Sequence, residues 1–192
     1  NTQAEHETLG YIKNDSSNLY VAFKALGNTD YIRAGIRARD GINWLDDQVA
    51  IGIDTFGDGR YYVRFSANPL GSIGDNKVDN KDDFDGSYNV EFDAKARITN
   101  LGYEVEFVIP FSSLNFPDTE KQELKLMLSR KLYNKGTESR YMNYAKIDGA
   151  GCIICQSNEI YSVENIVKKN KKRLIPSLTA NSIRERLSLI HI

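Results

Sequence analysis

The chain has 192 residues and a net charge of -1, and its composition is 41% hydrophobic and 27% charged. These values are typical of one globular domain and argue against intrinsic disorder. The small net charge provides no global field that would attract nucleic acid or an anionic membrane, so we expect no nucleic-acid partner. No run of about 18 apolar residues occurs, so we expect no transmembrane helix.

The chain opens NTQAEHETLG, with neither an initiator Met nor the charged start and apolar core of a signal peptide. We therefore expect a fragment or a processed form of a longer protein. For such a form, the missing signal carries no information about secretion.

Apolar and polar residues alternate with a period of two along much of the chain, which is the pattern of half-buried β-strands. In chain order the alternating segments are 18–26, 48–54, 61–68, 103–110 and 124–132. The apolar face of the first contains Leu19, Val21 and Phe23, and that of the last contains Leu124, Leu126 and Leu128. Asp58-Gly59 predicts a tight hairpin turn, across which we expect Asp54 and Arg60 to pair.

Helical signals are few. The segment from Pro110 to Phe116 predicts a single turn between strands, because Pro117 would end a helix quickly. Many short strands separated by turn residues favour an all-β fold, an antiparallel β-sandwich of jelly-roll-like type with little helix.

The segment RARDGINWLDDQ has the residue types of a sugar site. Trp44, the only tryptophan, offers a flat ring that can stack on a pyranose. Arg37, Arg39, Asp46 and Asp47 offer groups that can hydrogen-bond to paired hydroxyls. The alternative is that Trp44 caps the end of the core and that the two carboxylates end a loop.

A polar segment, expected to be a loop, extends from Gly71 to Ser87. Its oxygen ligands could hold calcium, although the spacing of an EF-hand is absent. The alternative is a solvated loop without a metal. The candidate ligands are Asp75, Asp79, Asp82, Asp83 and Asp85.

Cys152 and Cys155 form a C-x-x-C motif, which is found in redox pairs and in zinc sites. No helical pattern follows it, and the two histidines, His6 and His191, lie near opposite ends of the chain. A short loop disulfide or two free thiols therefore fit better than a metal or redox role, and the disulfide would require an oxidising compartment.

A glycosidase would need two carboxyl groups across a cleft, and the chain offers many acids without singling out a pair. The candidates considered are Asp46, Asp47, Asp54, Glu104 and Glu106. Motifs of hydrolases and nucleotide-binding proteins are absent, so we expect no enzyme. The basic run from Lys168 to Arg173 has no interleaved aromatic residues, which argues against nucleic-acid binding.

Four stretches together resemble a known family: NDSSNLYVAFKA, IRARDGINWLDDQVAIGIDTFGDGRYYVRFSANPLG, GYEVEFVIPFSSLNFP and LMLSRKL. The resemblance is to the family 9 carbohydrate-binding-module-like domain at the amino end of bacterial outer-membrane-associated proteins, and it covers residues 8–166. It implies a β-sandwich, a non-catalytic glycan-binding role linked to polysaccharide catabolism, and a location in the cell envelope (periplasm or outer membrane) or outside the cell.

The resemblance also implies a domain organisation. Residues 1–166 would be the β-sandwich, lacking a strand at its start, and residues 167–186 would lead into a following β-barrel domain. Residues 187–192 resemble a non-native tail.

The chain departs from sugar-binding members of that family, which clamp the sugar between two tryptophans. Here Trp44 would have to act alone or with Tyr88. We therefore expect an oligo- or polysaccharide ligand stacked on Trp44, with Arg37, Arg39 and Asp46 fixing its orientation. The alternative is an accessory sandwich that packs on its own barrel or on a partner and binds no sugar.

Overall fold

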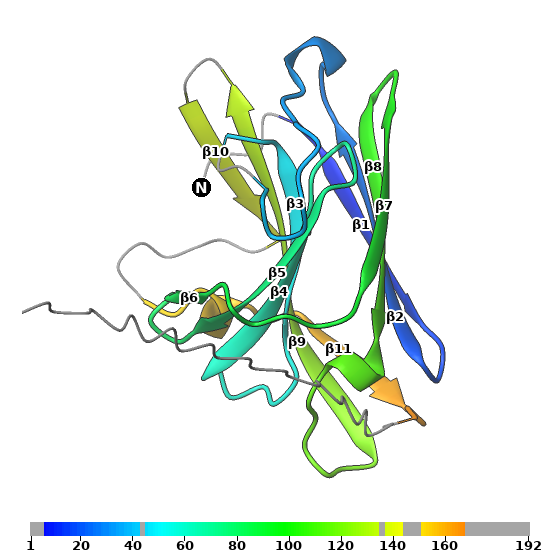
Figure 1. The fold of residues 1–192 in the computed structure, drawn as a ribbon. Coiled ribbons are helices and arrows are strands. Elements are labelled where there is room, and N and C mark those ends of the chain that lie inside the picture. The colour runs from blue at the N-terminus through cyan, green and yellow to red at the C-terminus, as the bar shows by residue number, and fades with distance from the viewer. Residues whose placement is uncertain (1–5, 43–44, 135–136, 144–150, 168–192) are drawn as a thin grey trace, which may run out of the picture.

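Two antiparallel β-sheets pack face to face in the computed structural model, which describes residues 6–42, 45–134, 137–143 and 151–167 (Figure 1). The smaller sheet has the order β1-β2-β8-β7, and the larger has the order β10-β9-β3-β4-β5-β6. β11 pairs with the first residues of β9, on the edge that β10 occupies further along. The prediction of an all-β antiparallel sandwich is confirmed. The strands are β1 (Thr8–Asn14), β2 (Asn18–Leu26), β3 (Gln48–Asp54), β4 (Tyr61–Ala67), β5 (Ile73–Asp79), β6 (Phe84–Asp85), β7 (Asp93–Thr99), β8 (Gly102–Pro110), β9 (Lys121–Asn134), β10 (Thr137–Met142) and β11 (Ile160–Glu164).

Helical structure in the described residues is limited to the 3-10 turns η1 (Thr29–Tyr31), η2 (Phe111–Ser113) and η3 (Ile154–Gln156). η2 is the single turn predicted between strands. No helix in these ranges is long and apolar enough to cross a membrane.

The core lies between the two sheets and is built from the predicted apolar faces. Phe23 of β2 and Phe107 of β8 meet edge to face at 5.9 Å between ring centroids, and Phe65 of β4 meets Phe92 at 4.9 Å. Leu19, Val21, Leu124 and Leu126 are also buried there, as the alternation predicted.

The outer face of the larger sheet is also partly covered, which simple alternation does not predict. Tyr62, Val78, Met127 and Ile154 form a second buried cluster on this side. Ile154 belongs to η3, so the segment that carries the two cysteines packs on the sheet (Figure 1). β3 is consequently buried along its whole length.

The prediction of a loop over residues 71–87 is wrong for its first half, because β5 occupies residues 73–79. Asp75 in this strand is buried, and its carboxylate accepts hydrogen bonds from Val90 N and from Arg39. The polar composition of β5 therefore did not indicate a strand, because the charge of its buried Asp75 is compensated by residues distant in the sequence.

The prediction of a tight turn fastened by Asp54 and Arg60 is also wrong. β3 and β4 are joined by residues 55–60, and Arg60 instead pairs with Asp58 at 2.7 Å. The Asp54 carboxylate is buried and accepts hydrogen bonds from the backbone N–H groups of Phe56, Gly57 and Gly59 at 2.8–2.9 Å. Asp54 thus organises the loop from inside.

Several predictions concern residues outside the described ranges. They include the role of Trp44, the basic run 168–173, most of the linker 167–186 and the tail 187–192.

Candidate functional site

A cleft of about 350 Å³ lies on the outer face of the larger sheet, and we call it the outer-face cleft. Its floor is low because the central outward positions of the sheet carry small side chains. Ser66 of β4 lies between Ala50 of β3 and Gly74 of β5, and Ala50 lies opposite Ser129 of β9. Small residues in adjacent strands therefore form a shallow trough across the sheet.

Two loops and a short strand border the trough. Asp40 and Ile42, from the loop before β3, line it, as do Ile153 beside η3 and Phe84 of β6. The Asp40 N–H donates to the carbonyl of Ile73 at 3.0 Å, which holds the first loop against β5. The outer-face cleft is therefore bounded by segments that are far apart in sequence.

Polar side chains connect across the cleft. Arg64 Nη2 donates to Gln48 Oε1 at 2.8 Å, and Gln48 lies opposite Lys131 in the neighbouring strand β9. On its other side, Arg64 lies opposite Asn76 of β5. Guanidinium, amide and ammonium groups thus line one continuous surface, which suits a ligand rich in oxygen atoms.

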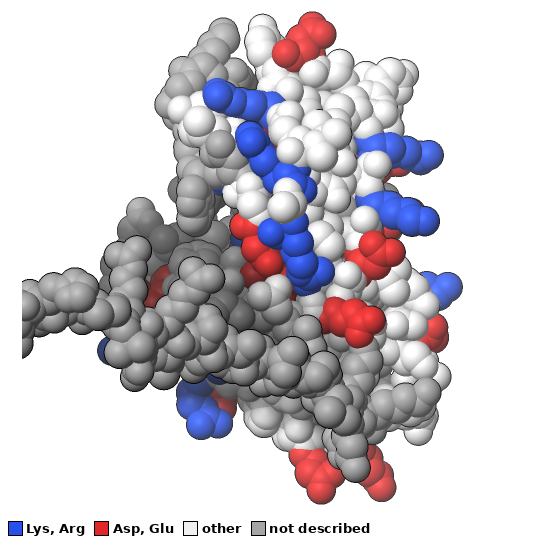
Figure 2. All heavy atoms as spheres, in the orientation of Figure 1, with Lys and Arg blue, Asp and Glu red and all other residues white. Residues whose placement is uncertain are grey.

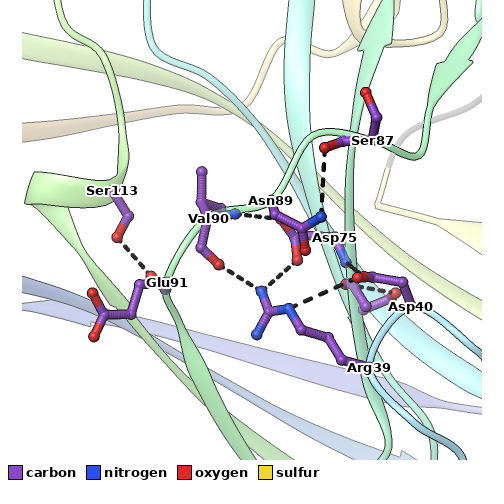
Figure 3. A network of polar contacts seen from close by, with 10 residues as sticks. Arg39, Asp40, Asp75, Ser87, Asn89, Val90, Glu91 and Ser113 are labelled. Atoms are coloured by element: carbon purple, nitrogen blue, oxygen red, sulfur yellow. Dashed lines mark hydrogen bonds and ion pairs between the residues drawn. The ribbon is translucent and has the colours of Figure 1, made fainter. Parts of the chain in front are cut away.

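Arg39 is held in a network beside the cleft (Figure 3). Its guanidinium pairs with the buried Asp75 carboxylate, donates to the Val90 carbonyl at 2.5 Å and lies 4.8 Å from the Phe92 ring centroid. Asp75 N donates to Asp40 Oδ1 at 2.9 Å. Burial raises the pKa of Asp75, although the hydrogen bonds from Val90 and Arg39 oppose that shift. Arg39 and Asp75 therefore fasten the segment around Val90 to the sheet.

Asp46 and Asp47 are almost completely buried and hold the loop that precedes β3. Asp46 accepts from Asn68 Nδ2 at 3.2 Å, and Asp47 accepts from Tyr133 N at 2.8 Å and Arg33 N at 3.4 Å. Burial raises the pKa of Asp47. These two carboxylates were predicted either to bind a sugar or to end a loop. Their observed contacts are those expected for the second alternative.

Arg37 is the more exposed partner in this loop, with 42% of its side chain accessible and its Nε 3.9 Å from Asp46 Oδ2. Figure 2 shows Lys and Arg side chains gathered in a column over the region of β3 and the loop that precedes it. Tyr88 is partly buried against the main core, and burial raises its pKa. The clamp of Trp44 and Tyr88 stays a prediction, because Trp44 lies outside the described residues.

The structure does not bring the five candidate calcium ligands together. Asp75 contacts Arg39, and Asp79 accepts from the backbone N–H groups of Lys81 and Asp83. Asp82 accepts from Ile153 N at 3.0 Å, and Asp85 accepts from Ser87. In the described ranges no three acidic, His or Cys side chains are grouped as a metal would require. Calcium stays a prediction without a set of ligands.

Cys152 and Cys155 form a disulfide that packs against the loop held by Asp54. Both sulfurs contact the carbonyl oxygen of Gly59, at 3.5 and 3.7 Å. A Cβ on Gly59 would lie 2.5 Å from Cys155 Sγ, so only glycine permits this approach. Ile154, between the cysteines, is completely buried in the second cluster.

The candidate acids of a glycosidase are dispersed. Asp54 is occupied by three backbone N–H groups. Glu104 pairs with Arg97 at 2.6 Å on the outer face of the smaller sheet, and Glu106 is exposed two residues further along the same strand. These acids do not face one another across the outer-face cleft.

No protein-family model and no curated protein matches the chain. Solved structures do match in fold. A protein of Bacteroides uniformis with a provisional carbohydrate-binding assignment matches with a TM-score of 0.63 and 14% identity, covering 84% of this chain and 79% of that chain. A family 9 carbohydrate-binding module of Caldicellulosiruptor kristjanssonii, in complex with cellotriose, matches with a TM-score of 0.56 and 12% identity, covering 85% and 76%. The chain has the fold of a family 9 carbohydrate-binding module. The same organism's module in complex with glucose matches with a TM-score of 0.51.

The family 9-like fold was predicted from the sequence, but the residues of the outer-face cleft were not. The signal that could have found them is the outward face of β3 and β4. There the small residues Ala50, Gly52 and Ser66 occur where a solvated strand would carry long polar side chains, and Gln48 and Arg64 flank them. Such a face indicates that something other than bulk water covers it.

Proposed function

We propose that this family 9-like sandwich is a non-catalytic carbohydrate-binding domain and that its ligand occupies the outer-face cleft. The observation that supports the proposal best is the polar row of Gln48, Arg64 and Lys131 above a trough of small residues. A sugar presents hydroxyl oxygens around its ring, and the amide, guanidinium and ammonium groups of this row can hydrogen-bond to them.

The comparisons support the same role, because two matching solved structures are carbohydrate-binding modules in complex with cellotriose and glucose. Modules of this kind bind without turnover, which agrees with the dispersed acids of the described residues. Trp44 retains its proposed part as a stacking platform.

Isothermal titration with a broad panel of neutral and acidic oligosaccharides tests the proposal. Gln48→Ala removes the acceptor that orients Arg64 and should weaken binding about tenfold, a loss of about 1.4 kcal/mol. Trp44→Ala should weaken it further if the ring stacks on the sugar. The control is Lys24→Ala on the outer face of the smaller sheet, which should leave binding unchanged. Absence of heat with every glycan would refute the proposal.

We propose further that the domain belongs to a larger protein of the bacterial cell envelope, linked to polysaccharide catabolism and continuing into a β-barrel. The Cys152–Cys155 disulfide supports an oxidising compartment such as the periplasm. Cell fractionation with an antibody against the domain tests the location. Recovery from the cytoplasm, with both thiols reactive toward maleimide, would contradict it.

The second candidate function is an accessory sandwich without sugar binding. It is favoured by the contacts of Arg39, Asp46 and Asp47, the predicted ligand-binding residues, because these contacts hold loops of the domain itself. Acrylamide quenching of the single Trp44 separates the two functions. An accessory role predicts a shielded tryptophan whose fluorescence no glycan alters, whereas sugar binding predicts quenching that a saturating glycan suppresses.

A further inference from the structure

The charged groups around the outer-face cleft are unequal in number. Arg64, Arg130 and Lys131 line it, and the lining carboxylates are Asp40 and Asp75. Both carboxylates interact with a fourth cation, Arg39, whose Nε lies 3.9 Å from Asp40 Oδ2 and whose Nη2 contacts Asp75. Among the described residues, these four cations therefore exceed the two carboxylates by two.

The position of each charge reduces this excess to one and assigns it to Arg64 and Lys131 against Asp40. The Asp75 side chain has no accessible surface, so its charge faces Arg39 and Val90 rather than a ligand. Arg130 is also buried, and its Nη1 is directed to Thr8 Oγ1 and to the carbonyls of Glu7 and Leu26. Arg64 lines the cleft from β4, between β3 and β5, and is only partly buried, whereas Lys131 and Arg130 are buried, so Arg64 is the most accessible cation of the lining.

We propose that the outer-face cleft prefers an acidic sugar and that Arg64 binds the carboxylate of a uronic acid. The proposal rests on the carbohydrate-binding function proposed above and names its ligand class. A guanidinium can donate two parallel hydrogen bonds to a carboxylate. The amide of Gln48, which already accepts from Arg64, keeps that guanidinium oriented and presents its own N–H groups to neighbouring hydroxyls. The ammonium of Lys131, opposite Gln48, adds to the positive potential.

The first test changes the ligand and leaves the protein untouched. Binding of an oligogalacturonate is compared by isothermal titration with binding of the same oligosaccharide after methyl esterification, which removes the charge and keeps the ring hydroxyls. We expect esterification to weaken binding about tenfold or more and added salt to weaken binding of the free acid alone. Equal binding of the two forms would overturn the proposal.

The second test changes the protein. Arg64→Gln should weaken binding of the free acid about tenfold and leave binding of the ester nearly unchanged. The control is Arg97→Gln, which removes the same charge from the outer face of the smaller sheet, where Arg97 pairs with Glu104. Both variants are checked for a native circular dichroism spectrum. If Arg64→Gln does not fold, the comparison of the free acid with its ester on the unchanged protein decides the question.

The outcomes distinguish this inference from the function on which it rests. Tight binding of neutral oligosaccharides, unaffected by Arg64→Gln, would refute the acidic preference and retain the carbohydrate-binding function. Absence of binding to neutral, acidic and esterified glycans would refute both. A loss specific to the free acid in Arg64→Gln, with Arg97→Gln unchanged, would support both.

Discussion

Asp54→Asn tests whether the buried carboxylate holds the connection between β3 and β4. Asp54 Oδ1 accepts from Phe56 N and Gly57 N, and Oδ2 accepts from Gly59 N. Asparagine keeps one carbonyl oxygen for the first two donors but directs an N–H group toward the Gly59 N–H. A buried donor left without an acceptor costs about 1–3 kcal/mol, and loss of the charge weakens the other two bonds. We expect the free energy of unfolding to fall by about 3 kcal/mol.

Urea unfolding followed by circular dichroism measures this loss, which corresponds to roughly 6–12 °C in Tm for a chain of this size. Amide hydrogen exchange at Gly59 should accelerate in the same variant, because its N–H loses its acceptor. The control is Asp58→Asn in the same loop, where the exposed pair with Arg60 should contribute less than about 1 kcal/mol. A loss in Asp54→Asn no larger than that in Asp58→Asn would refute the reasoning.

Three further predictions concern the same side of the molecule. Gly59→Ala should destabilise the fold by about 1–3 kcal/mol more than Gly57→Ala in thermal unfolding, because both have positive φ but only the Cβ added at Gly59 would lie 2.5 Å from Cys155 Sγ; equal losses would contradict this. Ile154→Ala should cost about 2–5 kcal/mol in urea unfolding, since the side chain is fully buried in the second cluster. A loss below 1 kcal/mol would show that the cluster is dispensable. Because burial raises the folded-state pKa of Asp47, its stabilising contribution is complete below the unfolded pKa of about 3.9 and is lost as pH rises through the folded pKa. The stability of the parent chain relative to Asp47→Asn should therefore fall as pH rises above about 4, and a difference independent of pH would refute the assignment.

Strands that face the core on one side and solvent on the other were predictable from the sequence. β2 and β8 show this, because Phe23 and Phe107 are buried whereas Lys24 and Glu106 are not. β5 was missed because its polar residues resemble those of a loop. The burial of Asp75 depends on Arg39, whose contact with it cannot be inferred from local sequence. The alternation of apolar and polar residues predicts which apolar side chains of a strand are buried. It cannot predict a charged side chain that is buried in an ion pair.

The candidate site is less predictable from the sequence than the fold, for a related reason. Sequence reasoning favoured residues near Trp44 because their side chains have the chemistry of sugar recognition. The structure uses Asp46 and Asp47 to satisfy the backbone N–H groups of Tyr133 and Arg33 and the side chain of Asn68. A carboxylate has the same appearance in sequence whether it binds a ligand or caps a loop, and only burial separates these roles.

The outer-face cleft is bordered by two segments, around Asp40 and around Ile153, that are distant in the sequence and lie over the same sheet. Asp40 is held at one border of the cleft by two hydrogen bonds to β5: its N–H donates to Ile73 O, and its Oδ1 accepts from Asp75 N. Ile153 lies at the other border, next to the Cys152–Cys155 disulfide. Both sulfurs of this disulfide contact the Gly59 carbonyl, and the Gly59 N–H donates to Asp54. A perturbation of Asp54 can therefore alter the cleft through packed contacts, without touching its polar row. If the cleft is altered in this way, Asp54→Asn will weaken the binding of acidic and of esterified oligosaccharides equally, because it displaces the border at Ile153 and leaves the charge of Arg64 in place.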